Sequence, residues 1–156
     1  MEMGIDVIIP ENKWGYSLAE RPKDYKYPVL WLLCGGGFDY TDWQRYTAIE
    51  LYAAQAGIAV VMPSAYYSGY MDTIHGDYKY FSVITDEISK LAVKLFPLSE
   101  KREDNFGAGF SMGGYGAFKW AMHNPEKFRC CGVFSGPIGI VPQEPVHYKE
   151  NEIRLR

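Results

Sequence analysis

Residues 105–115 read Asn-Phe-Gly-Ala-Gly-Phe-Ser-Met-Gly-Gly-Tyr, and this stretch decides the fold that the sequence predicts. Its centre, residues 109–113, matches the pattern G-x-S-x-G, a tight turn from a strand into a helix that exposes a nucleophilic serine, here Ser111. The chain folds so sharply there that side chains two positions either side of the serine would collide. Glycine at 109 and 113 removes them.

The residues before and after this turn have the patterns expected of a buried strand and a helix. The residues before the serine are apolar, as a buried strand requires, and Ala117, Trp120 and Ala121 recur after it at helical spacing. Asn124-Pro125 then ends the helix. An ordinary glycine turn remains an alternative for the pentapeptide. A dinucleotide fingerprint would need glycine where Met112 stands, and no Gly-Lys-Ser/Thr of a phosphate loop follows any glycine run.

Composition describes an ordinary globular chain. Of its 156 residues, 47% are apolar and 22% are charged, and the net charge is −3, which favours one domain over residues 1–156 and no nucleic-acid partner. No apolar run is long enough to cross a membrane, and the first residues lack the pattern of a secretory signal, so we expect a cytoplasmic protein. We expect Cys130 and Cys131 to pack rather than form a disulfide. Neither a metal nor a cofactor is expected.

Hydrophobic patterning outside the central stretch predicts alternating strands and helices. Strands are expected at residues 3–10, 29–34, 58–63, 105–110 and 128–135, and helices at residues 41–57, 81–96 and 111–124. Thr41 opens the first helix with a capping-box pattern, and Gly57 ends it. The expected core faces of the first two helices are Ile49, Tyr52, Ala53 and Ala56, and Ile84, Ile88, Leu91, Ala92 and Leu95. This order predicts an α/β fold with a mostly parallel central sheet.

Two loops are expected to border the serine. Gly35-Gly36-Gly37 follows a buried strand directly, where backbone N–H groups can point into a site, although a flexible loop has the same composition. The loop at residues 64–80 is long and rich in tyrosine and glycine, and loops of this length are usually functional. We interpret it as pocket wall; its aromatic residues are Tyr66, Tyr67, Tyr70, Tyr78 and Tyr80.

With these residues in place, the chain resembles the esterase D group of α/β-hydrolases, which includes tributyrin esterases, S-formylglutathione hydrolases and feruloyl esterases. The resemblance covers residues 5 to about 140 and is strongest at residues 109–118; other matching segments are residues 7–11, 27–33, 101–104, 124–128 and 135–136. It implies a three-layer α/β-hydrolase sandwich that lacks the C-terminal strands of the family. It also implies a small-molecule ester substrate with a short acyl group.

By the same resemblance, Ser111 is the nucleophile, and the N–H groups of Met112 and Gly36 form the oxyanion hole. The family's histidine before the glycine loop is replaced by Cys34, and Cys34 as a nucleophile remains an alternative. Gly37, Tyr66, Tyr67 and His75 are the candidate pocket residues.

The base that should activate the serine is harder to find. Family members continue beyond the length of this chain with units that carry an acid and a histidine, in the order Ser, Asp/Glu, His. His123 lies on the serine's own helix, about 18 Å away at helical rise. His75 precedes the serine, and His147, preceded by Glu126 and Glu144, falls in a proline-rich tail expected to be irregular over residues 138–156.

Two further readings therefore stay open. Without a base, the chain is a catalytically silent relative that binds a ligand or self-associates, and acyl transfer to an acceptor other than water fits the same site. The strand at residues 128–135 is expected to be an exposed apolar edge, which favours a homo-oligomer or a covering role for the tail.

Overall fold

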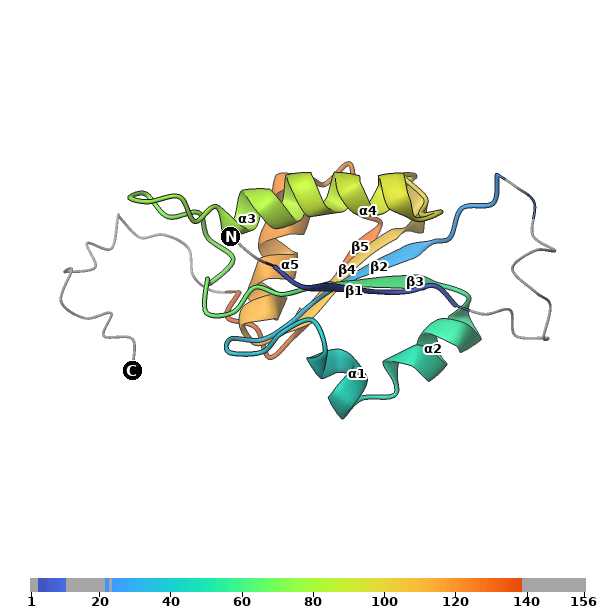
Figure 1. Cartoon of the computed structure of the whole chain (residues 1–156), viewed down its shortest axis with the longest axis horizontal. Coiled ribbons are helices and arrows are strands. Elements are labelled where there is room, and N and C mark those ends of the chain that lie inside the picture. The colour runs from blue at the N-terminus through green and yellow to red at the C-terminus, as the bar shows by residue number, and fades with distance from the viewer. Residues whose placement is uncertain (1–2, 11–21, 23, 139–156) are drawn as a thin grey trace.

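A five-stranded sheet organises the protein, with strand order β1-β3-β2-β4-β5. The computed structural model describes residues 3–10, 22 and 24–138. β1 (Ile5–Ile8) pairs antiparallel with β3 (Ala59–Pro63), and all other pairings are parallel. They join β2 (Val29–Leu33), β4 (Asn105–Phe110) and β5 (Cys130–Phe134) (Figure 1). The mostly parallel α/β sheet predicted from the sequence is confirmed.

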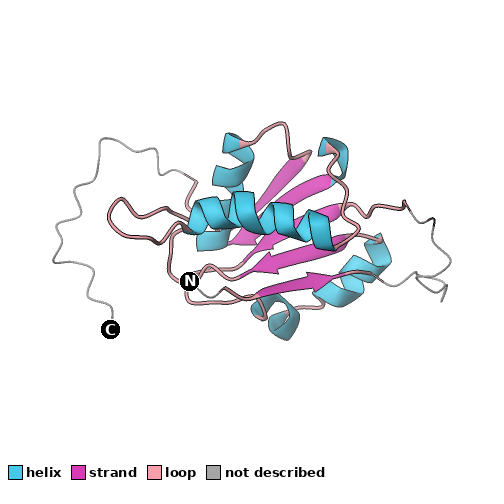
Figure 2. Cartoon of the chain, turned by 45° about the horizontal axis from the view of Figure 1, so that its top comes forward, coloured by secondary structure: helices cyan, strands magenta, loops and turns pink. Residues whose placement is uncertain are grey.

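Helices cover both faces of the sheet and make three layers (Figures 1 and 2). α1 (Asp42–Tyr46) and α2 (Ile49–Ala56) lie on one face. The other face carries α5 (Met112–His123) and a continuous helix assembled from α3 (Tyr80–Ser82), the π-helical segment η2 (Val83–Ile88) and α4 (Ser89–Leu95). A short 3₁₀ turn, η3 (Arg102–Asp104), leads into β4. The parallel strands therefore end together beside the start of α5, where Ser111 stands.

The helix predicted over residues 41–57 is two helices in the structure. Thr47 has extended backbone angles, φ −140° and ψ 171°, which interrupt the helix between α1 and α2. The predicted capping box is also wrong, because the Thr41 side chain caps no helical N–H and donates instead to Asp39 Oδ1 at 2.7 Å. The predicted end at Gly57 is confirmed by its left-handed φ of 67°. Of the expected core face, Ala53 is buried, whereas Tyr52 and Ala56 are exposed.

In the helix over residues 80–95, some of the buried residues differ from those that the sequence pattern predicted. Ile84 and Ala92 are buried as predicted, but Leu91 and Leu95 are 52% and 64% exposed. The cause is the π-helical segment, whose wider turn rotates everything after it by about one residue position. Downstream of it the core-facing residues become Ser89, Ala92, Val93 and Phe96.

The main core lies between β2, β4 and the helices α3–α5. Trp31 and Trp120 are 0% and 1% exposed and meet edge to face, with ring centroids 5.3 Å apart. Asn105, the first residue of β4, is buried but uses its whole side chain. Its Oδ1 accepts from Trp31 Nε1 at 3.0 Å, and its Nδ2 donates to the carbonyls of Ser99 and Lys101 at 2.8 Å each. This core fixes the position at which β4 begins.

β5 lies at the edge of the sheet and pairs with β4 alone among the described strands. Phe134, at its end, is 56% exposed. Cys130 is also exposed, so its predicted packing role is wrong, whereas Cys131 is half-buried against the main core; both are free thiols. Self-association through this edge stays a prediction. The predicted tail, apart from Ile138, lies outside the described residues. No helix of the described segments has the length and apolarity to span a membrane.

Candidate active site

Ser111 stands at the turn between β4 and α5, as the pattern G-x-S-x-G predicts. Its backbone has φ 52° and ψ −123°, a strained conformation that a non-glycine residue adopts only when its surroundings impose it. The residue is exposed. Its backbone N–H donates to the carbonyl of Phe134 at 2.8 Å, which ties the turn to the end of β5. The hydroxyl is therefore presented to solvent from a rigid bend.

The glycines of the turn are required by backbone contacts. A Cβ on Gly109 would lie 2.3 Å from the carbonyl oxygen of Gly113, and one on Gly113 would lie 2.4 Å from the carbonyl oxygens of Leu33 and Cys34. Real Cβ atoms do not approach backbone so closely. Gly114 is tight as well, with 3.1 Å to both Gly109 O and Val133 Cγ1. The steric reason predicted for these glycines is confirmed.

The glycine loop after β2 lies directly beside the start of α5. A Cβ on Gly36 would lie 3.5 Å from Met112 Sδ and 3.8 Å from Met112 Cβ, so the two residues are neighbours. The loop is shaped by two hydrogen bonds, from Phe38 N–H to the Gly35 carbonyl at 3.3 Å and from Gly37 N–H to the Tyr66 carbonyl at 3.2 Å. Gly37 needs its left-handed φ of 80° for this turn.

The backbone N–H groups of Gly36 and Met112, two neighbouring residues, have no recorded acceptor among the described residues. Within the described part of the chain, no acceptor is recorded for the N–H of Gly36. Met112 is the first residue of α5, and a helix offers no internal carbonyl to its first N–H groups. The helix dipole also favours negative charge at this end. The N–H groups of Gly36 and Met112 are therefore the candidate donors to a negatively charged group beside Ser111.

Tyr70 holds the glycine loop in place. Its hydroxyl donates to the carbonyl of Cys34 at 2.9 Å, immediately before the loop. Burial raises the pKa of Tyr70 well above 10, so the hydroxyl stays a donor. Its ring fills the space over Gly116, whose Cβ would lie 2.4 Å from it, and its carbonyl accepts from Lys119 Nζ at 2.9 Å. Tyr70 is 1% exposed, so its predicted place in the pocket wall is wrong.

Cys34 is a poor candidate for the nucleophile. The residue is 1% exposed, and its Sγ lies 3.6 Å from Tyr70 Oη and 3.7 Å from the carbonyl of Pro63. Burial raises the pKa of the Cys34 thiol, which disfavours the reactive thiolate. Cys34 is a buried residue that directly follows β2 and connects this strand to the glycine loop.

The predicted pocket residues divide into two groups. Tyr66 and Tyr67 lie beside the glycine loop: a Cβ on Gly36 would be 3.7 Å from Tyr67 Cδ1, and Tyr67 is 79% exposed. His75 is exposed within a projecting loop closed by the Asp72–Lys79 bridge, and no contact recorded for the described residues joins it to Ser111. The structure therefore brings Gly37, Tyr66 and Tyr67 to the site and leaves His75 apart.

No described histidine serves Ser111 as a base. His123 is at the far end of α5, where its Nδ1 lies 2.9 Å from the carbonyl of Lys119 and its ring packs on Phe81. His147 and Glu144 lie outside the described residues. Glu126 accepts from Asn124 Nδ2 at 3.3 Å, beyond the same far end of α5.

An apolar cavity of about 630 Å³ lies next to this site on the α1 face of the sheet. Its lining does not include Ser111, Gly36 or Met112, so it borders the reacting centre without containing it. The lining residues are Phe38, Asp42, Trp43, Tyr46, Thr47, Phe110 and Phe134. The described residues hold no group of three or more His, Cys, Asp or Glu that could bind a metal ion.

Comparison with known proteins places this geometry in a family. The family model described as "Putative esterase" matches residues 1–151, and the chain belongs to that esterase family of α/β-hydrolases. An acetyl esterase from Caldicellulosiruptor saccharolyticus is 30% identical over 121 residues, 78% of this chain and 46% of the relative. An S-formylglutathione hydrolase from Paracoccus denitrificans is 29% identical over 131 residues, 70% of this chain and 46% of the relative.

Solved structures agree with this assignment. The Staphylococcus aureus fluorophosphonate-binding serine hydrolase FphF superposes with a TM-score of 0.75 at 37% identity, over 85% of this chain and 50% of that one. The S-formylglutathione hydrolase FrmB from the same organism gives a TM-score of 0.72 at 36% identity, over 86% of this chain and 52% of that one. The chain therefore spans about half the length of the relatives it matches.

Sequence reasoning missed the residues that support the loop. Tyr70 was indistinguishable from its exposed neighbours, because the loop shows no periodicity that separates buried from exposed tyrosines. One signal was present: Gly116 lies inside the helix, beyond the two glycines of the turn, and a glycine inside a helix indicates close approach of another group. That group is the Tyr70 ring.

Proposed function

We propose that the protein is a serine ester hydrolase in which Ser111 attacks the ester carbonyl and the N–H groups of Met112 and Gly36 hold the resulting oxyanion. One observation carries the proposal: an exposed serine with φ 52° stands at a helix start that lies against the glycine loop. Preorganised donors of this kind stabilise the charge that develops in the transition state, and removing one typically costs about 3 kcal/mol.

The reaction needs a proton acceptor as well as a nucleophile. The Ser111 hydroxyl forms a bond to the carbonyl carbon while its proton passes to a base, and collapse of the tetrahedral intermediate releases the alcohol and leaves an acyl-serine. Water then hydrolyses that ester. Since none of the described histidines contacts Ser111, we propose slow turnover supported by the oxyanion hole, unless His147 supplies the base.

We further propose esters with short acyl groups as substrates. Two of the relatives that match this chain are named as an acetyl esterase and an S-formylglutathione hydrolase, and acetyl and formyl groups contain two carbons and one carbon. In this chain the Tyr67 ring lies over Gly36 and Gly37, the loop that neighbours Met112 at the start of α5. We propose that an aromatic ring at this place limits the length of the acyl group that the site accepts.

The test is p-nitrophenyl acetate turnover together with labelling by a fluorophosphonate probe. We expect the native chain to release p-nitrophenol and to take one label, and Ser111→Ala to lose both. Ser135→Ala is the matched control, because Ser135 is another exposed serine with positive φ, 50°, at the end of a strand. Labelling that survives in Ser111→Ala, or that disappears in Ser135→Ala alone, would contradict the assignment of Ser111.

A second candidate function is ligand binding without turnover. The observation in its favour is that the described residues place no base beside Ser111. It predicts that an ester ligand shifts the melting temperature of the protein while neither p-nitrophenol release nor fluorophosphonate labelling occurs. Labelling of Ser111 excludes it.

A further inference from the structure

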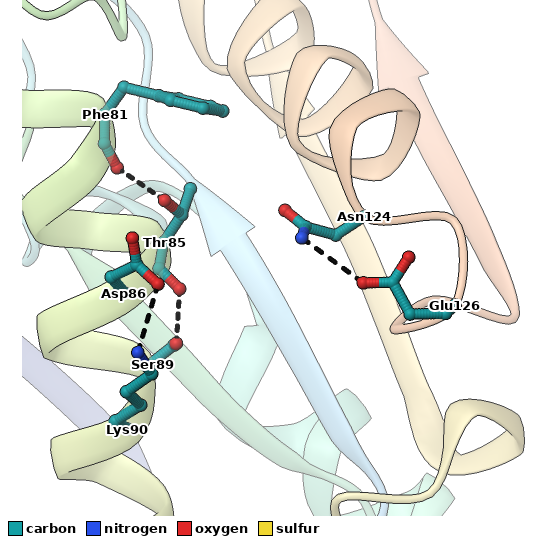
Figure 3. A network of polar contacts seen from close by, with 7 residues as sticks. All are labelled: Phe81, Thr85, Asp86, Ser89, Lys90, Asn124 and Glu126. Carbon is teal, nitrogen blue, oxygen red and sulfur yellow. Dashed lines mark hydrogen bonds and ion pairs between the residues drawn. The ribbon is translucent and has the colours of Figure 1, made fainter.

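A second cavity, of about 590 Å³, lies at the other end of α5. One wall is the continuous helix of η2 and α4, which presents Thr85, Asp86, Ser89 and Lys90, and the opposite wall carries Asn124 and Glu126 (Figure 3). α5 has 12 residues, so this cavity is about 18 Å from Ser111 at helical rise. The esterase proposal makes no use of it.

Lys127 has an unusual position in this cavity. Its Nζ lies 4.8 Å from the ring centroid of Trp31 and 4.6 Å from that of Trp120, over the two buried indoles of the core. Among the described residues none gives this Nζ a hydrogen bond or an ion pair. Cation–π contacts hold an ammonium without consuming its N–H donors, and they hold a neutral amine only weakly.

The hydroxyl, amide and charged groups of the cavity nearest to the helix η2–α4 and to Asn124 have partners. Asp86 forms an ion pair with Lys90 at 3.2 Å, and Glu126 accepts from Asn124. Ser89 Oγ donates to the Thr85 carbonyl at 2.5 Å. The charged or titratable groups that line the cavity around Lys127 are Asp86, Lys90, Glu100, His123 and Glu126. The cavity thus offers one amine that is both accessible and unpaired.

Burial changes the protonation of this amine. Desolvation lowers the pKa of Lys127 to about 8, and Lys90 acts in the same direction, whereas the carboxylates of Asp86, Glu100 and Glu126 oppose the change. The cation–π contacts with Trp31 and Trp120 favour the ammonium and oppose this effect, so the free amine is a minority form near neutral pH, although more abundant than in an exposed lysine. An amine in that form is a nucleophile for carbonyl carbon.

We propose that Lys127 is an acylation site, at which the side-chain amine in this cavity takes a small acyl group from an activated donor such as a thioester, an acyl phosphate or an aryl ester. The amine nitrogen bonds to the acyl carbon, and the bond from that carbon to sulfur or oxygen breaks. The leaving group departs as thiolate, phosphate or phenolate, and the extra proton on nitrogen passes to solvent. No oxidant or reductant is needed. The product is a neutral amide.

The expected reactivity follows from two opposing effects. At pH 7.5 an amine whose pKa is about 8 contains much more free base than an ordinary lysine, because lysine side chains titrate near 10.4. Its lower basicity reduces the intrinsic rate of attack, but by less than the gain in free base, because nucleophilicity falls less steeply than basicity. We therefore expect Lys127 to be acylated severalfold faster than exposed lysines such as Lys94.

Lys119 provides a matched comparison within the same protein. It is also partly buried and lies over an aromatic ring, 4.1 Å from the centroid of Phe81, and burial lowers its pKa too. Its Nζ, however, donates to the Tyr70 carbonyl at 2.9 Å, which stabilises the ammonium. We expect Lys119 to label more slowly than Lys127.

The experiment uses the Ser111→Ala chain with limiting p-nitrophenyl acetate between pH 6.5 and 9.5. Neutral hydroxylamine then removes any acyl-serine or acyl-tyrosine, and peptide mass spectrometry quantifies the acetyl group on each lysine. We expect Lys127 to be acetylated first, with a rate that is half-maximal near pH 8. Indole fluorescence should change with the same rate, because the amide loses its cation–π contacts with Trp31 and Trp120.

Two variants complete the test. Lys127→Arg keeps a cation over the indoles but should lose both the label and the fluorescence change. Asp86→Asn removes a carboxylate and releases Lys90, so the labelling profile of Lys127 should move to lower pH, whereas Glu87→Gln on the same helix should leave it unchanged. Lys127 labelling no faster than Lys94 at pH 7.5 would overturn the proposal. Because Ser111 is absent from the protein used, failure here leaves the esterase proposal untouched.

Discussion

The two ends of β4 are built in opposite ways. At its start, Asn105 is 2% exposed, and its side chain makes three hydrogen bonds with its neighbours. After its last residue, Ser111 is exposed, has a strained backbone and makes no recorded side-chain hydrogen bond to any described residue. At Asn105 the polar side-chain atoms all have hydrogen-bond partners. At Ser111 the hydroxyl and the nearby Gly36 N–H have no recorded partner among the described residues.

This difference shows how the fold supports the site. A strained residue persists only where the surrounding structure determines its conformation, and the strain of about 1–3 kcal/mol is offset elsewhere. Here the register of β4 is set by Asn105, by its pairing with β2 and by the Trp31–Trp120 core. The end of β4 next to Ser111 therefore does not need further hydrogen bonds to hold the strand in register. The four predictions below test this contrast, from the largest effect to the smallest.

Adding a methyl group at the turn should be the most damaging change. In Gly113→Ala the new Cβ meets the backbone of Leu33 and Cys34 at 2.4 Å, and backbone cannot move aside, so we expect a loss of about 4 kcal/mol of unfolding free energy. Gly107→Ala in the adjoining strand β4 is the control, with contacts of 3.6 Å or more, and should cost less than about 1 kcal/mol. Urea denaturation of both variants measures the difference, and equal losses would contradict the steric account.

Removing the anchor at the opposite end of β4 should come second. Asn105→Ala leaves the Trp31 N–H and the Ser99 carbonyl without a partner and removes one of the two hydrogen bonds to the Lys101 carbonyl, so we expect a loss of about 2–3 kcal/mol. Asn124→Ala, which removes one contact with the exposed Glu126, should stay within about 0.5 kcal/mol. Thermal unfolding of the two variants compares them. A small effect at Asn105 would mean that other contacts set the register.

Removing the Tyr70 hydroxyl, which binds the residue before the glycine loop, should reduce fluorophosphonate labelling much more than it reduces the unfolding free energy. Tyr70→Phe keeps the ring over Gly116 but leaves the buried Cys34 carbonyl unsatisfied, at a cost of about 1.5 kcal/mol. Since Gly36 follows two residues later, we expect fluorophosphonate labelling to slow by about tenfold or more. Tyr78→Phe, at an exposed ring, is the control. Labelling that is as fast in Tyr70→Phe as in the native chain would remove Tyr70 from the positioning of the loop.

The smallest effect should have the opposite sign. Ser111→Gly relieves the positive φ, because glycine adopts such angles without a Cβ clash, and we expect a gain of about 1 kcal/mol in unfolding free energy together with loss of labelling. Ser111→Ala retains the strain and should leave stability nearly unchanged. A destabilised glycine variant would show that the serine side chain contributes to the fold rather than to the site.

Much of the fold could be predicted because its pattern is local. The run at residues 29–33, the glycines around Ser111 and the left-handed stop at Gly57 each follow from short-range sterics or periodicity, and the structure confirms them. Predicted helix faces failed where backbone geometry changed within a helix. Leu91 and Leu95 are exposed because they follow the π-helical segment Val83–Ile88, and no residue pattern in the sequence predicts a π-helical segment.

The site was predictable only in part, for a related reason. The neighbourhood of Gly36 and Met112 rests on a family pattern, and the structure brings the two together. The roles of Tyr70 and Lys127 depend on contacts between distant segments, Tyr70 with Cys34 and Lys127 with Trp31. Long-range contacts leave no periodic trace in one sequence.

The most direct test of the central claim is a crystal structure of the chain after reaction with a fluorophosphonate. We predict a covalent bond from phosphorus to Ser111 Oγ, with the phosphoryl oxygen about 2.7–3.1 Å from the backbone nitrogens of both Gly36 and Met112. A phosphoryl oxygen directed to solvent, or an adduct on any other residue, would contradict the account.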